Sequence, residues 1–307
     1  MRQHLHWSTK TEHPYVLNLD KNFLPYEGVE VTSKKFDFKG GEPHFQILSG
    51  TPTQDSVFVI TQRYNKIGDL FDIILANDAA RRMGFKTIKL VLPYFPAARQ
   101  DRVCNVGEPL TVKVFADMIN ACGFEEVIIL CPHSEVTPAL LNNVTVLDEL
   151  KYIEEVYMKT ITHPSFNTFN IVCPDAGAGK RVGKIVQHLS NKFPEATFNL
   201  IRCEKVRDVK DGSLKDFFVQ ADDLGGWPTL ICDDINSMGG TFIGLGKKLQ
   251  EKNCGKLMLF TAHADCVEGV QNIIENFDHY YTTNSKQDWD KFKYTFDGRF
   301  TCMKIEI

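Results

Sequence analysis

The stretch TLICDDINSMGGTF, residues 229–242, decides the fold predicted for this chain. It begins with a short apolar run, reaches two adjacent acids at Asp233 and Asp234, and passes through a loop to Gly239 and Gly240. The residues after the glycines repeat apolar side chains with helical spacing. A strand, a glycine-rich turn and a helix in this order form the building unit of an α/β protein.

Apolar runs of similar length recur along the chain, with amphipathic stretches between them. The runs are rich in Val, Ile and Leu without polar alternation, which is typical of strands covered on both faces in a parallel sheet. We predict such strands at residues 56–61, 87–95, 126–133, 169–175, 198–203, 229–234 and 256–264. Helical patterns occupy residues 68–83, 111–122, 179–192 and 240–253. The sequence therefore predicts an α/β fold with mainly parallel sheets flanked by helices.

Composition argues against several classes of protein. The 307 residues include 35 Lys and Arg against 39 Asp and Glu, a formal charge of −4, which argues against a strongly basic nucleic-acid binder. The chain has no apolar run of about 18 residues, and its first residues lack the apolar core of a signal peptide. We therefore expect a cytoplasmic protein without a membrane partner. The nine cysteines form no C-x-x-C pair and are expected to be reduced and mostly buried.

The turn after Asp233 and Asp234 has the features of a phosphate site next to a sugar site. The first N–H groups of a helix lack partners within the helix, and paired glycines let the backbone approach an anion closely. Two acids one step away can hold sugar hydroxyls, directly or through a divalent cation. Ribose 5-phosphate offers both groups. The alternative is an ordinary strand–helix loop with an acidic edge, since neither a P-loop nor a dinucleotide-binding glycine pattern fits.

The two halves of the chain share a layout of strand, loop, glycine, helix, glycine and strand. This is compatible with duplication of one α/β unit or with chance similarity of two such segments. Only the second half carries the adjacent acids Asp233 and Asp234 at its strand end. We therefore expect the chemistry on the sugar in the second half.

The segment D-D-x-x-S-x-G-G-T at residues 233–241 resembles the phosphoribosyl pyrophosphate loop of type I phosphoribosyltransferase folds. Other segments narrow the resemblance to the ribose-phosphate pyrophosphokinase (phosphoribosyl pyrophosphate synthetase) family. The most specific of these is LPYFPAARQDR at residues 92–102. The others, in family order, are EPLT at residues 108–111, His133, CPDAG at residues 173–177, and KVR at residues 205–207. The resemblance covers residues 38–284, nearly the whole chain.

The resemblance implies two tandem type I phosphoribosyltransferase-like domains. Residues 1–152 would form the N-terminal domain on the ATP side, and residues 153–288 the C-terminal domain with the ribose 5-phosphate site. Residues 289–307 would form a C-terminal segment able to pack back on the N-terminal domain. A composition shift at residues 151–170 marks the boundary between the domains. Family members assemble from dimers into hexamers, so a homo-oligomer is expected.

The implied reaction transfers the diphosphoryl group of ATP to the C1 hydroxyl of ribose 5-phosphate, giving phosphoribosyl pyrophosphate and AMP. Such chemistry asks a protein mainly for alignment and for positive charge near the transferred oxygens. By resemblance, Lys205 stabilises the charge of the transferred group, and Arg207 contacts ribose 5-phosphate or the moving phosphates. In an extended flap both side chains would point to one face. A solvated charged hairpin is the alternative for this pair.

Further site residues follow from the same resemblance. Those implied in ATP binding are Phe38, Glu42, Arg99, Gln100, Asp101 and His133. Those implied in ribose 5-phosphate binding are Asp233, Asp234, Ser237, Met238, Gly239, Gly240 and Thr241. His133 and Asp175 would hold the Mg²⁺ that bridges the ATP phosphates, His133 through a water, because Mg²⁺ prefers oxygen ligands. A structural histidine and a solvated loop are the alternatives for His133 and for residues 99–102.

Three positions depart from the family pattern. Gly40 replaces an acid in the segment FKGGE at residues 38–42, which predicts looser nucleotide specificity. Ser237 replaces a third acid of the sugar loop but can still donate to a phosphate oxygen, and Met238 replaces a Thr, so weaker ribose 5-phosphate affinity is expected. These changes favour a second hypothesis, a catalytically impaired regulatory or binding homologue. A third is a phosphoribosyltransferase that consumes phosphoribosyl pyrophosphate, although residues 99–100 have no role in that reaction.

Overall fold

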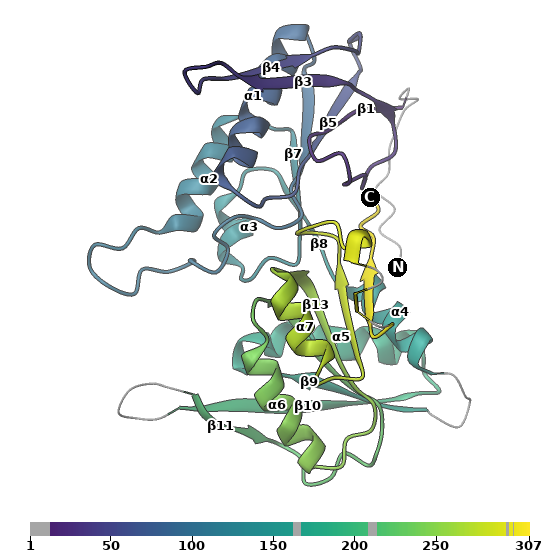
Figure 1. Cartoon of the computed structure of the whole chain (residues 1–307). Coiled ribbons are helices and arrows are strands. Elements are labelled where there is room, and N and C mark those ends of the chain that lie inside the picture. The colour runs from purple at the N-terminus through teal and green to yellow at the C-terminus, as the bar shows by residue number, and fades with distance from the viewer. Residues whose placement is uncertain (1–12, 162–166, 208–213, 293–294, 297) are drawn as a thin grey trace. The chain divides into compact units, whose positions relative to one another are not determined.

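The computed structural model describes residues 13–161, 167–207, 214–292, 295–296 and 298–307; the side chains of residues 206, 207, 214 and 215 lie outside this description. The chain divides into two compact units, Met1–Leu147 with Glu306–Ile307, and Asp148–Ile305 (Figure 1). Each unit contains a mainly parallel sheet with helices packed against it, which confirms the predicted α/β class. No helix among the described residues is long and apolar enough to span a membrane.

The first unit is built on a six-stranded parallel sheet with the order β2-β1-β5-β6-β7-β8. Its strands are β1 (Tyr15–Asn18), β2 (Val29–Glu30), β5 (Val57–Thr61), β6 (Thr87–Val91), β7 (Glu126–Leu130) and β8 (Val144–Leu147). The central strands are almost fully buried, as expected of apolar runs covered on both faces. The predicted strands at 87–95 and 126–133 end earlier than expected, and their last residues form loops at the carboxyl edge of the sheet.

The helices of the first unit are α1 (Ile67–Met83), α2 (Thr111–Ala121) and α3 (Val136–Leu140). Helix α1 buries Leu70 and Ile73 in a core that also contains Phe58. The helix ends at Met83 and is capped by Gly84, whose φ of 106° is left-handed and whose N–H bonds back to the last turn. Strands β3 (Ser33–Asp37) and β4 (Pro43–Ile47) form a separate antiparallel hairpin.

The second unit is built on a seven-stranded sheet with the order β11-β10-β9-β12-β13-β14-β15. All neighbours are parallel except β10 and β11, which form a long antiparallel extension (Figure 1). The strands are β9 (Thr168–Cys173), β10 (Thr197–Arg207), β11 (Leu214–Val219), β12 (Thr229–Asn236), β13 (Leu257–Ala264), β14 (His279–Thr283) and β15 (Phe300–Met303). Every residue of β13 is buried, which explains its unbroken apolar run.

The connections of the second unit run outward from the middle of its sheet. The helices are α4 (Leu150–Thr160), α5 (Gly179–Lys192), α6 (Gly240–Glu251) and α7 (Val267–Ile274), with short 3₁₀ turns η1 (Ala176–Ala178) and η2 (Asp290–Phe292). The β9–α5–β10 connection runs toward the β11 edge of the sheet, and the β12–α6–β13–α7–β14 connections run toward the β15 edge. Right-handed crossovers therefore place α5 on one face and α6 and α7 on the other. The carboxyl ends of β9 and β12 flank the point of reversal, where open α/β sheets bind ligands.

The boundary between the two units falls between Leu147 and Asp148 in the sequence, and α4 occupies part of the stretch 151–170. Strand β15 pairs with β14 in the second unit. The last residue belongs to the first unit, where the Ile307 N–H donates to the carbonyl of Pro25 at 2.9 Å.

Candidate active site

The loop between β12 and α6 leaves the start of the helix open. Gly239 precedes α6 with φ 81° and ψ −7°, a left-handed conformation that favours glycine. A Cβ at this position would lie 2.9 Å from Cδ1 of Ile273. Gly239 offers no capping side chain to α6, which begins at Gly240. The backbone N–H groups from Gly240 onward therefore provide the kind of site at which helices bind phosphate.

Asp233 and Asp234 lie beside this loop and share one arginine. Arg181, on the first turns of α5, donates from Nη2 to Oδ1 of Asp233, and its Nη1 lies 3.4 Å from Oδ1 of Asp234. Its Nε lies 3.8 Å from Oε1 of Glu149. Burial raises the pKa of Asp233 to about 7; Arg181 opposes this rise, and the charge of Asp234 adds to it. Sequence reasoning missed Arg181, although it closely follows the CPDAG segment.

Ser237 and Met238 are held by groups from the β13–α7 corner. Ser237 Oγ donates to Oδ2 of Asp265 at 2.7 Å. Its hydrogen therefore goes to a carboxylate, not to a phosphate oxygen as the sequence suggested. The carbonyl of Met238 accepts from Nδ2 of Asn272 at 3.0 Å, while the Met238 side chain is 57% exposed.

Lys205 and Asp175, assigned to catalysis and to metal binding, are brought together by the structure. Lys205 Nζ, on β10, donates to Oδ2 of Asp175 at 2.8 Å, and Oδ1 of Asp175 accepts from the N–H of Ala178 at 3.2 Å. Burial raises the pKa of Asp175, but the hydrogen bond and charge of Lys205, with nearby amides, lower it overall. Arg207 ends the same strand, but its side chain lies outside the described residues.

The donor chemistry of Asp175 fits a single ligand to Mg²⁺. No three His, Cys, Asp or Glu side chains of the described ranges gather into a metal site. Mg²⁺ does not require such a cage, because it keeps several waters and takes one or two carboxylates together with substrate phosphates. His133 lies in the first unit, exposed in the loop after β7.

The loop that contains Arg99, Gln100 and Asp101 follows β6 in the first unit. The Gln100 N–H donates to the carbonyl of Ala97 at 2.8 Å, and Ala97 has a φ of 56°, so the backbone turns sharply here. Arg99 and Gln100 are exposed, and Asp101 is half-buried. The two exposed side chains are thus presented at the carboxyl edge of the sheet.

Phe38 and Glu42 lie at the tip of the β3–β4 hairpin. The Phe38 N–H donates to the carbonyl of Glu42 at 2.8 Å, and Gly41 between them has a φ of 85°. The ring of Phe38, 52% exposed, lies 5.1 Å from that of Phe36 and 5.8 Å from that of His44. The hairpin tip therefore presents an aromatic surface to solvent.

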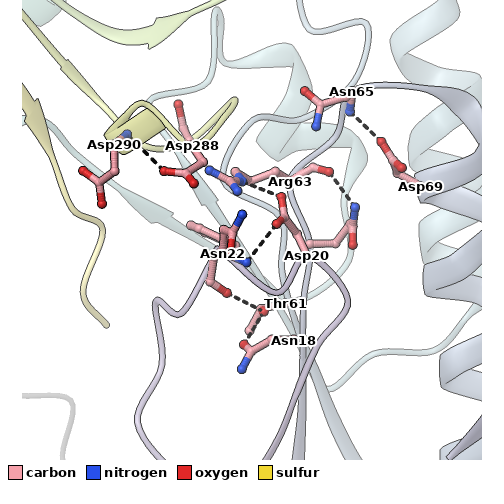
Figure 2. A network of polar contacts seen from close by, with 12 residues as sticks. Asn18, Asp20, Asn22, Thr61, Arg63, Asn65, Asp69, Asp288 and Asp290 are labelled. Atoms are coloured by element: carbon pink, nitrogen blue, oxygen red, sulfur yellow. Dashed lines mark hydrogen bonds and ion pairs between the residues drawn. The ribbon is translucent and has the colours of Figure 1, made fainter. Parts of the chain in front are cut away.

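Figure 2 shows a polar network of the first unit that the sequence did not reveal. Arg63, only 2% exposed, donates from Nε to Oδ2 of Asp20 at 2.7 Å. Oδ1 of Asp20 accepts from the Asn22 N–H at 3.1 Å, and Thr61 Oγ1 donates to Oδ1 of Asn18 at 2.7 Å. These bonds fasten the segment after β1 to the end of β5.

The cysteines are all free, but fewer than half of them are buried, against the expectation that most would be. Those at 131, 173, 203 and 232 are buried, and Cys104 is exposed. Burial raises the pKa of Cys203 to about 12 and that of Cys173 less strongly. A raised thiol pKa disfavours the reactive thiolate, which argues against a nucleophilic role for these two cysteines.

The comparisons with known proteins agree with the motifs. Residues 22–123 match the model of the N-terminal domain of ribose phosphate pyrophosphokinase. The chain is 26% identical over 284 residues to a ribose-phosphate pyrophosphokinase of Mycoplasma genitalium, covering 90% of this chain and 80% of that protein. It is 25% identical over 263 residues to that of Pyrococcus abyssi, covering 84% of each. The match to the Mycoplasma pneumoniae protein, 27% identical over 233 residues, spans 66% of that protein's length.

A solved structure extends the likeness to the fold. The crystal structure of phosphoribosylpyrophosphate synthetase from Mycobacterium smegmatis matches with a TM-score of 0.72 at 16% identity, over 95% of each chain. Its likeness shows that this chain has the same fold. The family model and the sequence relatives confirm the resemblance first indicated by the motifs: the chain is similar to the ribose-phosphate pyrophosphokinases.

Proposed function

We propose that this chain is a ribose-phosphate diphosphokinase. It would transfer the diphosphoryl group of ATP to the C1 hydroxyl of ribose 5-phosphate, giving phosphoribosyl pyrophosphate and AMP. One observation carries the proposal: the open start of α6, the acids of β12 and the Lys205–Asp175 pair all lie at one edge of one sheet, within the second unit. The names of the sequence relatives support the same activity.

Ribose 5-phosphate would bind along the β12–α6 loop. Its phosphate would accept from the N–H groups at the start of α6, which Gly239 leaves open. Its hydroxyls would donate to Asp233 and Asp234. Because Arg181 already neutralises part of the charge of these acids, they can approach a neutral sugar without a further cation.

The transfer step needs a cation at the moving group more than it needs covalent chemistry. The C1 oxygen attacks the β-phosphorus, the bond from that phosphorus to the oxygen shared with the α-phosphate breaks, AMP leaves with this oxygen, and the hydroxyl proton is released. Lys205, held 2.8 Å from Asp175, would move its ammonium onto the transferred group. Mg²⁺, with Asp175 as one ligand and His133 through a water, would supply charge neutralisation on the ATP phosphates. Arg207 would add a second cation beside Lys205.

The nucleotide would be recognised by the first unit. Arg99 can fork onto phosphate oxygens or stack on adenine, and Gln100 and Asp101 can bond around it. The exposed ring of Phe38, with Glu42 next to it, is suited to a base. Recognition of adenine from a neighbouring copy would require the homo-oligomer, built from dimers up to a hexamer, that the family resemblance implies. We place this reaction in the cytoplasm.

The pairing of Arg181 with both acids favours a second candidate, an impaired regulatory homologue. Asp233 and Asp234 are engaged before any sugar arrives, and Met238 gives the loop no hydroxyl. Such a protein would bind ribose 5-phosphate without turnover.

A single assay separates the two candidates. The purified chain is incubated with Mg²⁺, ATP and ribose 5-phosphate, and AMP and phosphoribosyl pyrophosphate are followed together. A diphosphokinase forms both products in equal amounts. Binding of ribose 5-phosphate without any AMP would refute the diphosphokinase and support the regulatory homologue.

A further inference from the structure

The loop that opens α6 rests on a carboxylate from another strand. Asp265 directly follows β13, and its Oδ2 accepts the hydrogen bond of Ser237 Oγ at 2.7 Å. Ser237 stands where the family pattern has a third acid. A carboxylate is therefore present beside this position, although the loop itself does not carry it.

Two further contacts fix Asp265. Lys286 Nζ, on a side chain only 11% exposed, lies 3.3 Å from Oδ1. The N–H of Asp265 donates to the carbonyl of Asn236 at 2.8 Å. Since one carboxylate oxygen faces the ammonium and the other faces the hydroxyl, the direction of the carboxylate is set.

The backbone of the loop has anchors of its own at the same corner. A Cβ on Gly269 would lie 1.5 Å from the Ser237 carbonyl oxygen, so only glycine permits this approach. Cys266 Sγ lies 3.3 Å from that oxygen and Asn272 holds the next carbonyl. The bond from Ser237 to Asp265 is therefore not needed to place the backbone; its specific effect is on the hydroxyl.

The direction of this hydrogen bond decides what Ser237 can offer a ligand. A hydroxyl has one hydrogen and two lone pairs, whereas an ionised carboxylate only accepts. Ser237 must therefore donate to Asp265, and its oxygen is an acceptor toward any other group. An acceptor suits a sugar hydroxyl and is repelled by a phosphate oxygen.

We propose that Asp265 is a positioning residue for the sugar. By accepting the hydrogen of Ser237, it leaves the Ser237 oxygen as an acceptor for a hydroxyl of ribose 5-phosphate. Asp265, at the end of the neighbouring strand, thus takes the place of the carboxylate that the family pattern has at residue 237. This inference rests on the proposed function, because it takes ribose 5-phosphate as the ligand.

The test is a double-mutant cycle on the full chain, with ribose 5-phosphate binding measured by calorimetry in the absence of ATP. Asp265→Ala and Ser237→Ala are each expected to lower the affinity about tenfold, the loss expected for a hydrogen bond to a charged or charge-oriented group. Because Asp265 acts through Ser237, the double variant should lose no more than either single variant. Additive losses, or unchanged affinity in Asp265→Ala, would overturn the proposal.

A rescue and a control distinguish positioning from a general structural role. Ser237→Asp combined with Asp265→Ala returns the acid to the loop and should restore the affinity to within about threefold, whereas a structural role of Asp265 would not be rescued. Glu275→Gln, an exposed acid at the end of α7, changes the same charge away from the loop and should bind like the parent chain. If the parent chain binds ribose 5-phosphate without forming AMP, the diphosphokinase fails and this cycle still decides the inference. If the parent chain does not bind it, the inference is overturned.

Discussion

The two units begin a helix after a strand in different ways: one loop supplies a side chain to the N–H groups at the start of the helix, and the other does not. In the first unit β5 leads to α1, and Oδ2 of Asp69 accepts from the N–H groups of Asn65 at 2.8 Å and Lys66 at 2.9 Å (Figure 2). In the second unit β12 leads to α6, and Gly239 offers no side chain. The first loop fills its anion position with its own carboxylate; the second leaves it open.

Charged groups of the two units also differ in how far their side chains are exposed. Arg63 is 2% exposed and paired with Asp20, whereas Lys205 and Asp175, which pair with each other, are 25% and 33% exposed. A buried ion pair cannot lose one partner without a large cost, while a partly exposed pair can exchange a partner for water or ligand. The charges of the first unit should therefore support the fold, and those of the second should support binding and turnover.

Removal of the Lys205 ammonium should give the largest effect. In Lys205→Ala we expect turnover to fall about 10³-fold, because a cation at the transferred phosphoryl group acts mainly in the transition state. Ribose 5-phosphate affinity and the free energy of unfolding should change little. Initial-rate kinetics and urea unfolding test this, with Lys184→Ala, which breaks the exposed pair with Asp148, as the matched control. Parental turnover in Lys205→Ala would remove it from the catalytic residues.

Arg63→Met should show the opposite pattern. It leaves the Asp20 carboxylate without its buried partner and should lower the free energy of unfolding of the first unit by about 3 kcal/mol. Amide hydrogen exchange of β1 and β5 measures this loss. Lys205→Met should lower stability by less than about 1 kcal/mol, because both members of its pair with Asp175 are partly exposed. Equal losses in the two variants would contradict the division between the units.

Gly239→Ala tests whether the open loop needs its conformation. A φ of 81° costs a residue with a Cβ about 1 to 2 kcal/mol, and the new Cβ would meet Ile273 at 2.9 Å. Gly298→Ala is the matched control, since Gly298 has a φ of 69° with nothing within 4 Å of its Cβ position. Both variants should lose stability in thermal unfolding, but only Gly239→Ala should also lose ribose 5-phosphate affinity. Undiminished affinity would show that the loop tolerates rearrangement.

The sequence predicted the parts of this comparison that depend on local pattern. Apolar runs predicted β5 and β12, helical spacing predicted α1 and α6, and the glycine pair predicted the open turn. Short or exposed strands such as β3 and β15 were not predicted from the sequence, because they lack a long apolar run. Local pattern thus fixes the elements and the type of turn between them.

Contacts between side chains that are distant in the sequence were not predicted, for another reason. Arg181 lies 52 residues from Asp233, and Ser237 lies 28 residues from Asp265. No periodicity links such residues, because only the order of strands in the sheet brings them together. The CPDAG motif pointed to Asp175, but no pattern pointed to Arg181, one turn after the motif, which pairs with Asp233 and Asp234. The contacts of the candidate site residues were therefore beyond local pattern, and the roles proposed for those residues stay predictions.

The smallest effect should be a pH dependence of stability that comes from Asp233 in the second unit. Its pKa is about 7 in the folded chain, against about 3.9 in an unfolded one. The folded state therefore binds this proton more tightly, so the contribution to stability is complete below about pH 4 and is lost as the pH rises to about 7. Asp233→Asn removes this titration. Its free energy of unfolding relative to the parent should rise by about 1 kcal/mol between these pH values and level off above them, less than the full pKa difference implies because water reaches the carboxylate. Urea unfolding of both chains across this pH range measures the difference. A difference that does not vary with pH would mean that Arg181 keeps Asp233 ionised throughout, which would contradict the contrast between the charges of the two units.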